Sequence, residues 1–148
     1  EEVGLGYARE AAMIALAREL DLFTLAYCFT PEEAEMMAAS GVDTIVAHLK
    51  TTAGGLVGLQ SPLALSDAFE AVTRIFDAAR AAAPDVLCVA HGGPLGTPQE
   101  TSELYRHTEA VGFVAASSME RLPTEDAVLA QARAFKSQQI TPQRRTQG

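Results

Sequence analysis

Several residues whose types suit acid–base or anion-binding chemistry come directly after apolar runs of this sequence. His91 follows the run Val86–Ala90 and precedes Gly92, Gly93 and Pro94. An imidazole at that place can act as a general acid or base or donate a hydrogen bond to an oxyanion; alternatively, it bonds only the neighbouring backbone. Glycine lets the backbone approach a ligand closely and reach positive φ. The N–H groups of this pair can therefore contact a phosphate, although a tight turn ahead of the proline needs glycines equally.

A second histidine, His48, ends another apolar run, DTIVA. Its imidazole can coordinate a metal or polarise a carbonyl, or it can be structural. Lys50 is a candidate phosphate partner or Schiff-base amine, and a solvated surface lysine is the alternative. The loop from Lys50 to Pro62 is rich in glycine and threonine, so it is either a lid over a substrate or a mobile connection. Its candidate ligand-binding residues are Thr52, Gly54 and Gly55.

A third group of polar residues follows the run GFVAA. The hydroxyl and N–H groups of Ser117 and Ser118 can take phosphate oxygens, or the two serines can be ordinary caps. Glu120 is a candidate catalytic residue, and Arg121 is a candidate clamp for a carboxylate or phosphate. Because these two are adjacent, they point apart, and a structural salt bridge is the alternative for both.

The bulk composition limits the partners of the chain. A net charge of −8 over 148 residues argues against nucleic-acid binding, which depends on clustered lysine and arginine. No run of about 18 apolar residues predicts a membrane span, and the first residues lack the pattern of a secretory signal. Cys28 and Cys88 lie inside apolar runs, which favours buried free thiols in a reducing compartment. We therefore expect a cytoplasmic protein.

The elements that position these residues alternate along the chain. Hydrophobic periodicity, caps and breakers predict helices and strands by turns. The predicted helices cover residues 7–20, 31–40 after the cap Thr30, 67–83 after the cap Ser66, 98–111, and 125–136 after the cap Thr124; the predicted strands cover 23–29, 43–49, 86–90 and 112–116. Such alternation is typical of an α/β fold with a parallel sheet and right-handed crossovers.

All the candidate residues follow predicted strands, at the end of a parallel sheet where α/β proteins bind ligands. Adjacent parallel strands lie about 4.8 Å apart. The loops after the strands VLCVA and GFVAA therefore surround one small volume. We expect an anion, a phosphate or a carboxylate, between His-Gly-Gly-Pro and Ala-Ser-Ser.

The segments GLGYAREAAMIALARELDL, TTAGG, AHGGPLGTPQ, GFVAASSMERLPTEDAV and ARAFK resemble the phosphoenolpyruvate hydrolase-like family, which is also described as a TIM-barrel signal-transduction family. The resemblance implies that residues 1–137 are the C-terminal half of a (β/α)₈ barrel, with four strands and about five helices. Residues 138–148 are expected to be a disordered polar tail. Two residues depart from the family pattern, which usually has glycine at Lys50 and a small or polar residue at Leu56.

The resemblance implies a protein that binds and transforms a small phosphorylated or carboxylated metabolite at the carboxyl-end rim of the barrel. The reaction would be that of a hydrolase or lyase on a phosphorylated enol or keto acid. A non-catalytic ligand-sensing barrel is the alternative, because the sequence offers no nucleophile–base–orienter triad. The cofactor stays open, and a divalent metal held by the missing half is one candidate. Four strands do not close a barrel, so we expect a longer chain or a homo-oligomer.

Overall fold

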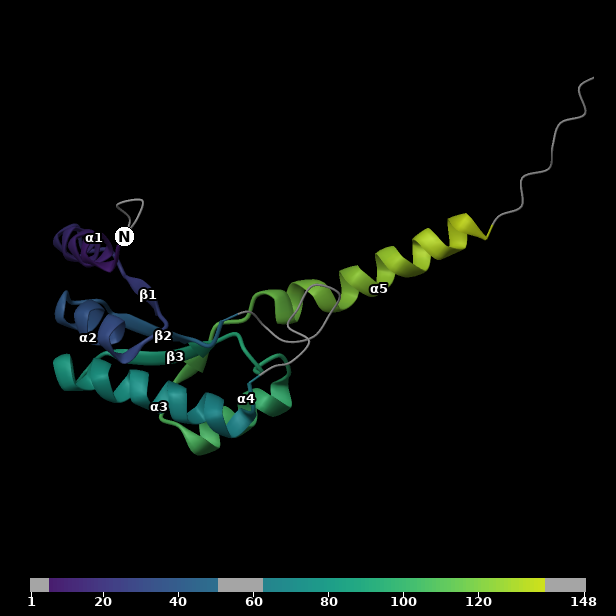
Figure 1. Ribbon diagram of the computed structural model, residues 1–148. Coiled ribbons are helices and arrows are strands. Elements are labelled where there is room, and N and C mark those ends of the chain that lie inside the picture. Colours follow the sequence, from purple (N-terminus) through teal and green to yellow (C-terminus); the bar gives the residue numbers. More distant parts are fainter. Residues whose placement is uncertain (1–5, 51–62, 138–148) are drawn as a thin grey trace, which may run out of the picture.

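The computed structural model describes residues 6–50 and 63–137 (Figure 1). The predicted tail 138–148 and the predicted loop ligands Thr52, Gly54 and Gly55 lie outside the described residues. So do the side chains of Ser117 and Arg121.

Helices and strands alternate along the described chain, as the sequence predicts. The elements are α1 (Tyr7–Glu19), β1 (Leu25–Cys28), α2 (Pro31–Ala39), β2 (Thr44–His48), α3 (Leu65–Ala82), β3 (Leu87–His91), α4 (Pro98–His107), β4 (Gly112–Phe113) and α5 (Ser117–Lys136). The strands form one sheet in the order β1-β2-β3-β4, and every neighbouring pair is parallel. The predicted parallel βα repeat is therefore confirmed.

Two of the helices start where the sequence places their caps. Thr30 accepts a hydrogen bond from the Glu33 N–H, and the Glu33 carboxylate accepts one from the Thr30 N–H. Thr97 and Glu100 form the same capping box at the start of α4. In both helices a proline follows the cap, where its missing N–H costs nothing. These boxes fix where the strand-end loops stop and the helices begin.

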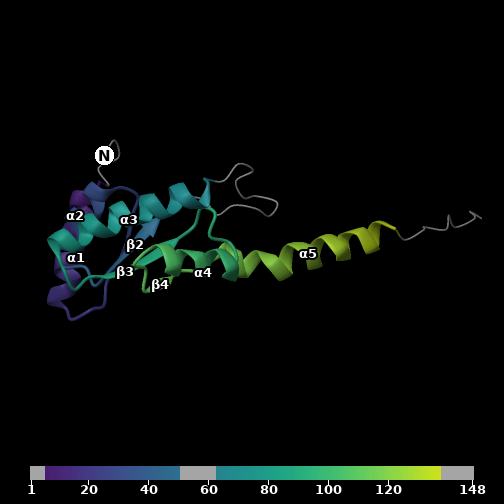
Figure 2. The ribbon, with the colours of Figure 1, turned by 90° about the horizontal axis from the view of Figure 1, so that it is seen from below.

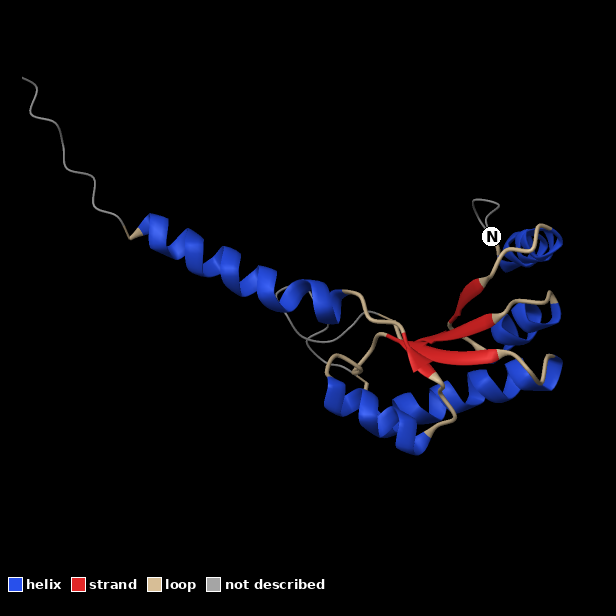
Figure 3. Cartoon of the chain, turned by 180° about the vertical axis from the view of Figure 1, so that it is seen from behind, coloured by secondary structure: helices blue, strands red, loops and turns tan. Residues whose placement is uncertain are grey.

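The two faces of the sheet differ in what covers them. On one face the helices pack against small side chains, and this layer forms the core (Figure 3). The strand residues in it are Ala26, Cys28, Ile45, Ala47, Cys88 and Ala90. On the opposite face Leu25, Tyr27 and Leu87 are exposed, because the described strands do not close on themselves.

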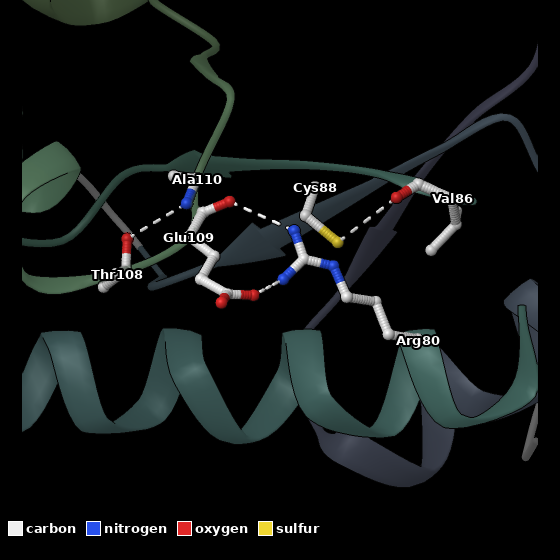
Figure 4. A network of polar contacts seen from close by, with 6 residues as sticks. All are labelled: Arg80, Val86, Cys88, Thr108, Glu109 and Ala110. Atoms are coloured by element: carbon white, nitrogen blue, oxygen red, sulfur yellow. Dashed lines mark hydrogen bonds and ion pairs between the residues drawn. The ribbon is translucent and has the colours of Figure 1, made fainter. Parts of the chain in front are cut away.

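An ion pair joins α3 to the segment between α4 and β4 (Figure 4). Arg80 of α3 pairs with the Glu109 carboxylate and donates to the Glu109 carbonyl oxygen at 3.2 Å. The Cys88 thiol lies beside this network. Burial raises its pKa, and the Arg80 guanidinium opposes the rise. Cys28 and Cys88 are both buried and free, as predicted.

Besides ending α4 at His107 and limiting β1 to Leu25–Cys28, the structure corrects three element boundaries. The predicted strand 112–116 covers only Gly112–Phe113, although the Val114 N–H still donates to Ala90 O at 2.9 Å. The predicted cap Ser66 lies inside α3, which begins one residue earlier at Leu65.

The third correction concerns the last helix. Thr124 is not its cap, since α5 begins at Ser117 and runs continuously to Lys136. The N–H groups of Met119 and Glu120 already donate to the Ala116 carbonyl, so the helix starts there. Ser118 and Glu120, predicted in a strand-end loop, are therefore in the first turns of a helix. Figures 1 and 2 show that α5 points away from the sheet.

Candidate functional site

The candidate site lies at the carboxyl ends of β1, β2 and β3, on the face that the helices leave uncovered. His48 ends β2 and His91 ends β3, and the two residues pair directly in the sheet register. Because side chains alternate along a strand, Tyr27 of β1 points to the same face as both histidines. The sheet thus brings together two histidines that lie 43 residues apart in the sequence.

Aromatic rings surround the histidine pair. The two imidazole centroids lie 4.9 Å apart at an angle of 71°. The ring centroid of Tyr27 lies 5.1 Å from that of His48 and 5.5 Å from that of His91. Phe29 lies 4.6 Å from His48, and Phe113 lies 6.5 Å from His91. We call these five residues the rim cluster, of which Phe113 of β4 also packs against the helix-covered core. The rings leave both histidines only partly exposed to solvent.

A backbone carbonyl fixes the tautomer of His91. Its Nδ1 lies 2.7 Å from the carbonyl oxygen of Val114, in the segment that follows β4. A carbonyl oxygen only accepts, so Nδ1 carries the hydrogen and donates it. In the neutral ring the other nitrogen, Nε2, is then an unprotonated acceptor.

His48 has the opposite tautomer. The Lys50 N–H donates to its Nδ1 at 3.0 Å, so Nδ1 is unprotonated and the hydrogen of the neutral ring is on Nε2. Burial, together with the charge of nearby His91, lowers the pKa of His48 below its ordinary value. His48 is therefore neutral near pH 7, with an N–H as its remaining polar group.

The two histidines thus offer complementary groups to a ligand. His48 offers a hydrogen-bond donor that stays neutral, which suits a carbonyl or enolate oxygen. His91 offers a lone pair, which suits a proton to be removed, and it becomes a cationic donor when it is protonated. An arrangement of this kind can polarise one oxygen while a proton is transferred nearby.

The two glycines after His91 let its loop pass against the loop after His48. Gly92 and Gly93 both have positive φ, +79° and +59°. A Cβ on Gly92 would lie 2.3 Å from the carbonyl oxygen of Lys50, and one on Gly93 would lie 2.7 Å from Cβ of Leu49. The Gly93 N–H donates to Lys50 O at 3.3 Å, so this predicted phosphate donor is engaged within the protein.

Lys50 itself adopts a left-handed conformation, with φ of +65°. An L-residue other than glycine is strained there. This conformation explains physically why glycine suits the position, and the side chain of Lys50 is exposed.

Two further predicted site residues that the structure describes, Ser118 and Glu120, lie on α5. Ser118 lines a groove with Tyr105 and Phe113, and neither His48 nor His91 is among the residues that line it. Glu120 is exposed on α5.

Sequence reasoning placed the stretch 27–30 among the strand-end loops, but it did not name the three aromatic residues of the rim cluster, Tyr27, Phe29 and Phe113, as site residues. The signal for Tyr27 is its position next to Cys28 in an apolar strand. Because side chains alternate along a strand, Tyr27 points to the face opposite Cys28, which is the face that the helices leave uncovered.

The start of α1 is attached to the same rim. The Tyr7 phenol donates to the carbonyl oxygen of Tyr27 at 3.0 Å. Burial and the Glu33 carboxylate raise the pKa of Tyr7, so the phenol stays protonated as this bond requires. This bond helps to hold β1 where Tyr27 faces the histidines.

Among residues 6–50 and 63–137, no group of three His, Cys, Asp or Glu side chains is placed to hold a metal ion. The predicted divalent metal therefore stays a prediction. Within the same residues, no helix has the length and apolar character needed to cross a membrane.

Comparison with known proteins relates the whole fold to one family. The family described as "Phosphoenolpyruvate hydrolase-like" matches residues 1–138. The "ToMV resistance protein Tm-1(GCR237)" of Solanum lycopersicum is 42% identical over 138 residues, which are 93% of this chain and 18% of that protein. The "Putative transcriptional regulatory protein y4pA" of Sinorhizobium fredii is 38% identical over 137 residues, 93% of this chain and 22% of that protein. This chain spans about a fifth of the length of these relatives.

A solved structure shows the same architecture. The chain matches a sialic acid aldolase of Ruminococcus gnavus, a TIM-barrel enzyme, with a TM-score of 0.52 and 17% identity. The match covers 88% of this chain and 42% of the aldolase chain. This likeness concerns the fold alone: the chain has the βα units of about half a TIM barrel, as predicted.

Proposed function

Because this chain belongs to the phosphoenolpyruvate hydrolase-like family, we propose that its rim cluster binds a small phosphorylated or carboxylated metabolite. His48 and His91 contact oxygen atoms of the ligand. The observation that carries the proposal is the pair of opposite tautomers, which places one Nε2–H donor and one Nε2 lone pair on neighbouring strands.

The proposed reaction is the protonation or deprotonation of an enol or keto acid, as a hydrolase or lyase would carry it out. His48 donates to the carbonyl or enolate oxygen without giving up its proton, since its pKa is lowered. His91 holds or moves the proton at Nε2. Ser117, Ser118 and Arg121 at the start of α5 are proposed to reach the phosphate or carboxylate group, with Glu120 as a further acid. Gly92 and the loop residues Thr52, Gly54 and Gly55 are proposed to line the same ligand.

A ligand-sensing barrel without turnover is the second candidate, and one observation favours it. Both imidazoles are oriented by backbone groups, the Lys50 N–H and the Val114 carbonyl. A carboxylate partner would raise the basicity of an imidazole, whereas a backbone carbonyl does so less. Binding would then be retained while proton transfer is slow.

Asparagine variants separate the ligand-facing atom of each histidine from its structural bond. In His48→Asn the amide oxygen still accepts from the Lys50 N–H, and in His91→Asn the amide N–H still donates to Val114 O. Both variants lose the Nε2 atom. Calorimetric titration with phosphoenolpyruvate should show affinity weakened about 10- to 100-fold in each, since a hydrogen bond to a charged group is worth about 1.5–3 kcal/mol.

The matched control is His107→Asn on α4, a surface histidine that stacks on Phe69 and pairs with Glu103. It should bind like the unmodified protein. If His48→Asn and His91→Asn both bound phosphoenolpyruvate as tightly as the control, the proposed site would be refuted. Phosphate release from phosphoenolpyruvate, followed on the same samples, distinguishes an enzyme from a sensor.

A further inference from the structure

Lys50 occupies a strained backbone position at the rim, two residues after His48. Its φ is +65°, in the left-handed region where an L side chain crowds its own backbone. The surrounding backbone holds it there, because the Lys50 N–H donates to Nδ1 of His48 at 3.0 Å and the Lys50 carbonyl oxygen accepts from the Gly93 N–H at 3.3 Å. Residues other than glycine that are kept in such conformations cluster at functional sites. Stability therefore does not explain why this position carries a lysine.

The side chain of Lys50 is a positive charge without a partner in the described part of the chain. It is exposed, and no described carboxylate lies within ion-pair distance of its ammonium. It is also the only permanently cationic side chain in the described strand-end segments, which cover residues 28–33, 48–50, 91–97 and 113–116. Because the whole chain has a net charge of −8, an anionic ligand at this rim needs a local cation to offset the repulsive field.

The sheet places Lys50 and the start of α5 on opposite sides of His91. Strands β2, β3 and β4 are neighbours in that order, and Lys50 follows β2 whereas α5 follows β4. With about 4.8 Å between neighbouring strands, the ends of β2 and β4 lie roughly 10 Å apart. A ligand whose central oxygen contacts His48 can thus present one anionic group to Lys50 and a second one to the start of α5.

We propose that the Lys50 ammonium binds the carboxylate of an enol or keto acid whose neighbouring oxygen accepts a hydrogen bond from His48. This inference rests on the proposed function of the rim cluster and adds a specificity-determining residue to it. In such an acid the carboxylate is bonded to the carbon that carries the oxygen, so the long and flexible side chain of a residue beside His48 can reach it. The phosphate is left to the start of α5. Glycine at this position would remove the strain and the charge together, and the chain keeps both.

Lys50→Met tests the charge alone, because it keeps the length of the side chain and the strain of the backbone. Calorimetric titration should show its affinity for phosphoenolpyruvate weakened about 10-fold by the loss of one charge-assisted hydrogen bond. Lys50→Arg, which keeps the charge, should retain most of the affinity. The matched control is Lys136→Met at the end of α5, which changes the net charge equally and should bind like the unmodified chain. If Lys50→Met bound as tightly as Lys136→Met, the proposal would be overturned.

Lys50→Gly separates a role in binding from a role in folding. It should raise the urea midpoint and yet weaken the binding of phosphoenolpyruvate as much as Lys50→Met does. An affinity that rises together with the stability would contradict the proposal. Pyruvate, which has the carboxylate and no phosphate, should show the same loss of affinity in Lys50→Met. A loss seen with phosphoenolpyruvate alone would assign Lys50 to the phosphate and overturn its assignment to the carboxylate.

The variants His48→Asn and His91→Asn distinguish a failure of this inference from a failure of the proposed function. If the histidine variants lose affinity and Lys50→Met does not, the rim cluster binds the ligand and only the role of Lys50 is wrong. If Lys50→Met loses affinity and both histidine variants keep it, Lys50 holds the carboxylate and the proposed function of the histidines is wrong.

Discussion

Replacing Gly92 by alanine should destabilise the protein far more than the same replacement at Gly41. Both glycines have positive φ, +79° and +88°. An added Cβ would lie equally close to a neighbour at each, 2.3 Å from the Lys50 carbonyl oxygen at Gly92 and 2.2 Å from the Arg18 guanidinium at Gly41. The difference is that the end of an exposed arginine can move, whereas a backbone carbonyl moves only with its loop.

The loss of stability at each glycine depends on which atoms must move to make room for the added Cβ. The left-handed conformation costs alanine about 1 kcal/mol at either site, and the loss of chain entropy in the unfolded state offsets about 0.4–1 kcal/mol of it. Gly41→Ala should therefore cost at most about 1 kcal/mol. At Gly92 the loops must separate by about 1 Å to reach ordinary contact. This movement strains the bonds Leu49 N–H to His91 O and Gly93 N–H to Lys50 O, at 2.9 and 3.3 Å. With about 1–3 kcal/mol for groups left unsatisfied, we expect a total of about 1–4 kcal/mol.

Urea unfolding at one fixed protein concentration measures both variants, since association would otherwise change the midpoint. With a slope of about 2 kcal/mol per molar, the midpoint of Gly92→Ala should fall by about 0.5–2 M, and that of Gly41→Ala by less than about 0.5 M. Equal midpoints would refute the argument that the two loops are packed backbone against backbone.

Three further outcomes are expected. Lys50→Gly should raise the free energy of unfolding by up to about 1 kcal/mol, and with it the urea midpoint, because glycine adopts the φ of +65° without strain. Lys50→Val should lower the midpoint. The reverse order would contradict the left-handed conformation. Thr24 donates to the Asp43 carboxylate at 2.7 and 2.8 Å and holds the Asp43 pKa below its usual range. Asp43→Asn should therefore lower the melting temperature at pH 7, and the difference should shrink as the pH falls through the lowered pKa; a difference that does not change with pH would refute this. Burial raises the pKa of Cys28 to about 12, so Ellman's reagent at pH 8 should label neither cysteine until guanidinium unfolds the chain, and fast labelling of the folded protein would show that the thiols are accessible.

Most of the fold follows from local signals in the sequence. The boxes Thr30-Pro31 to Glu33 and Thr97-Pro98 to Glu100 specify their helices by short-range hydrogen bonds, so they are legible without a structure. The start of α5 was mispredicted because Pro123-Thr124 is equally typical of a helix start. The Ala116 carbonyl, which accepts two N–H groups, begins the helix seven residues earlier than Thr124. No pattern of residue types shows whether the helix begins after Ala116 or after Thr124.

The site was predictable in part. His48 and His91 could be placed on one rim because parallel strands end at one edge of a sheet. Their tautomers could not, because these depend on the Lys50 N–H and the Val114 carbonyl, which are backbone groups that every sequence contains. The role of Gly93 was likewise open between turn and ligand, and only the position of Leu49 and Lys50 shows how closely the two loops approach.

The sequential strand order has a kinetic consequence for the histidine pair. Leu25 pairs with Thr44 and Val89 with Gly112, but Thr44 pairs with Leu87, which closes the longest stretch of chain in this sheet. The entropy lost in closing a loop grows with its length, and long-range contacts slow folding. The contact between β2 and β3 therefore bears the largest closure entropy of the three. Since this pairing also joins His48 to His91, the histidine pair forms only once the longest of these three stretches of chain has been closed.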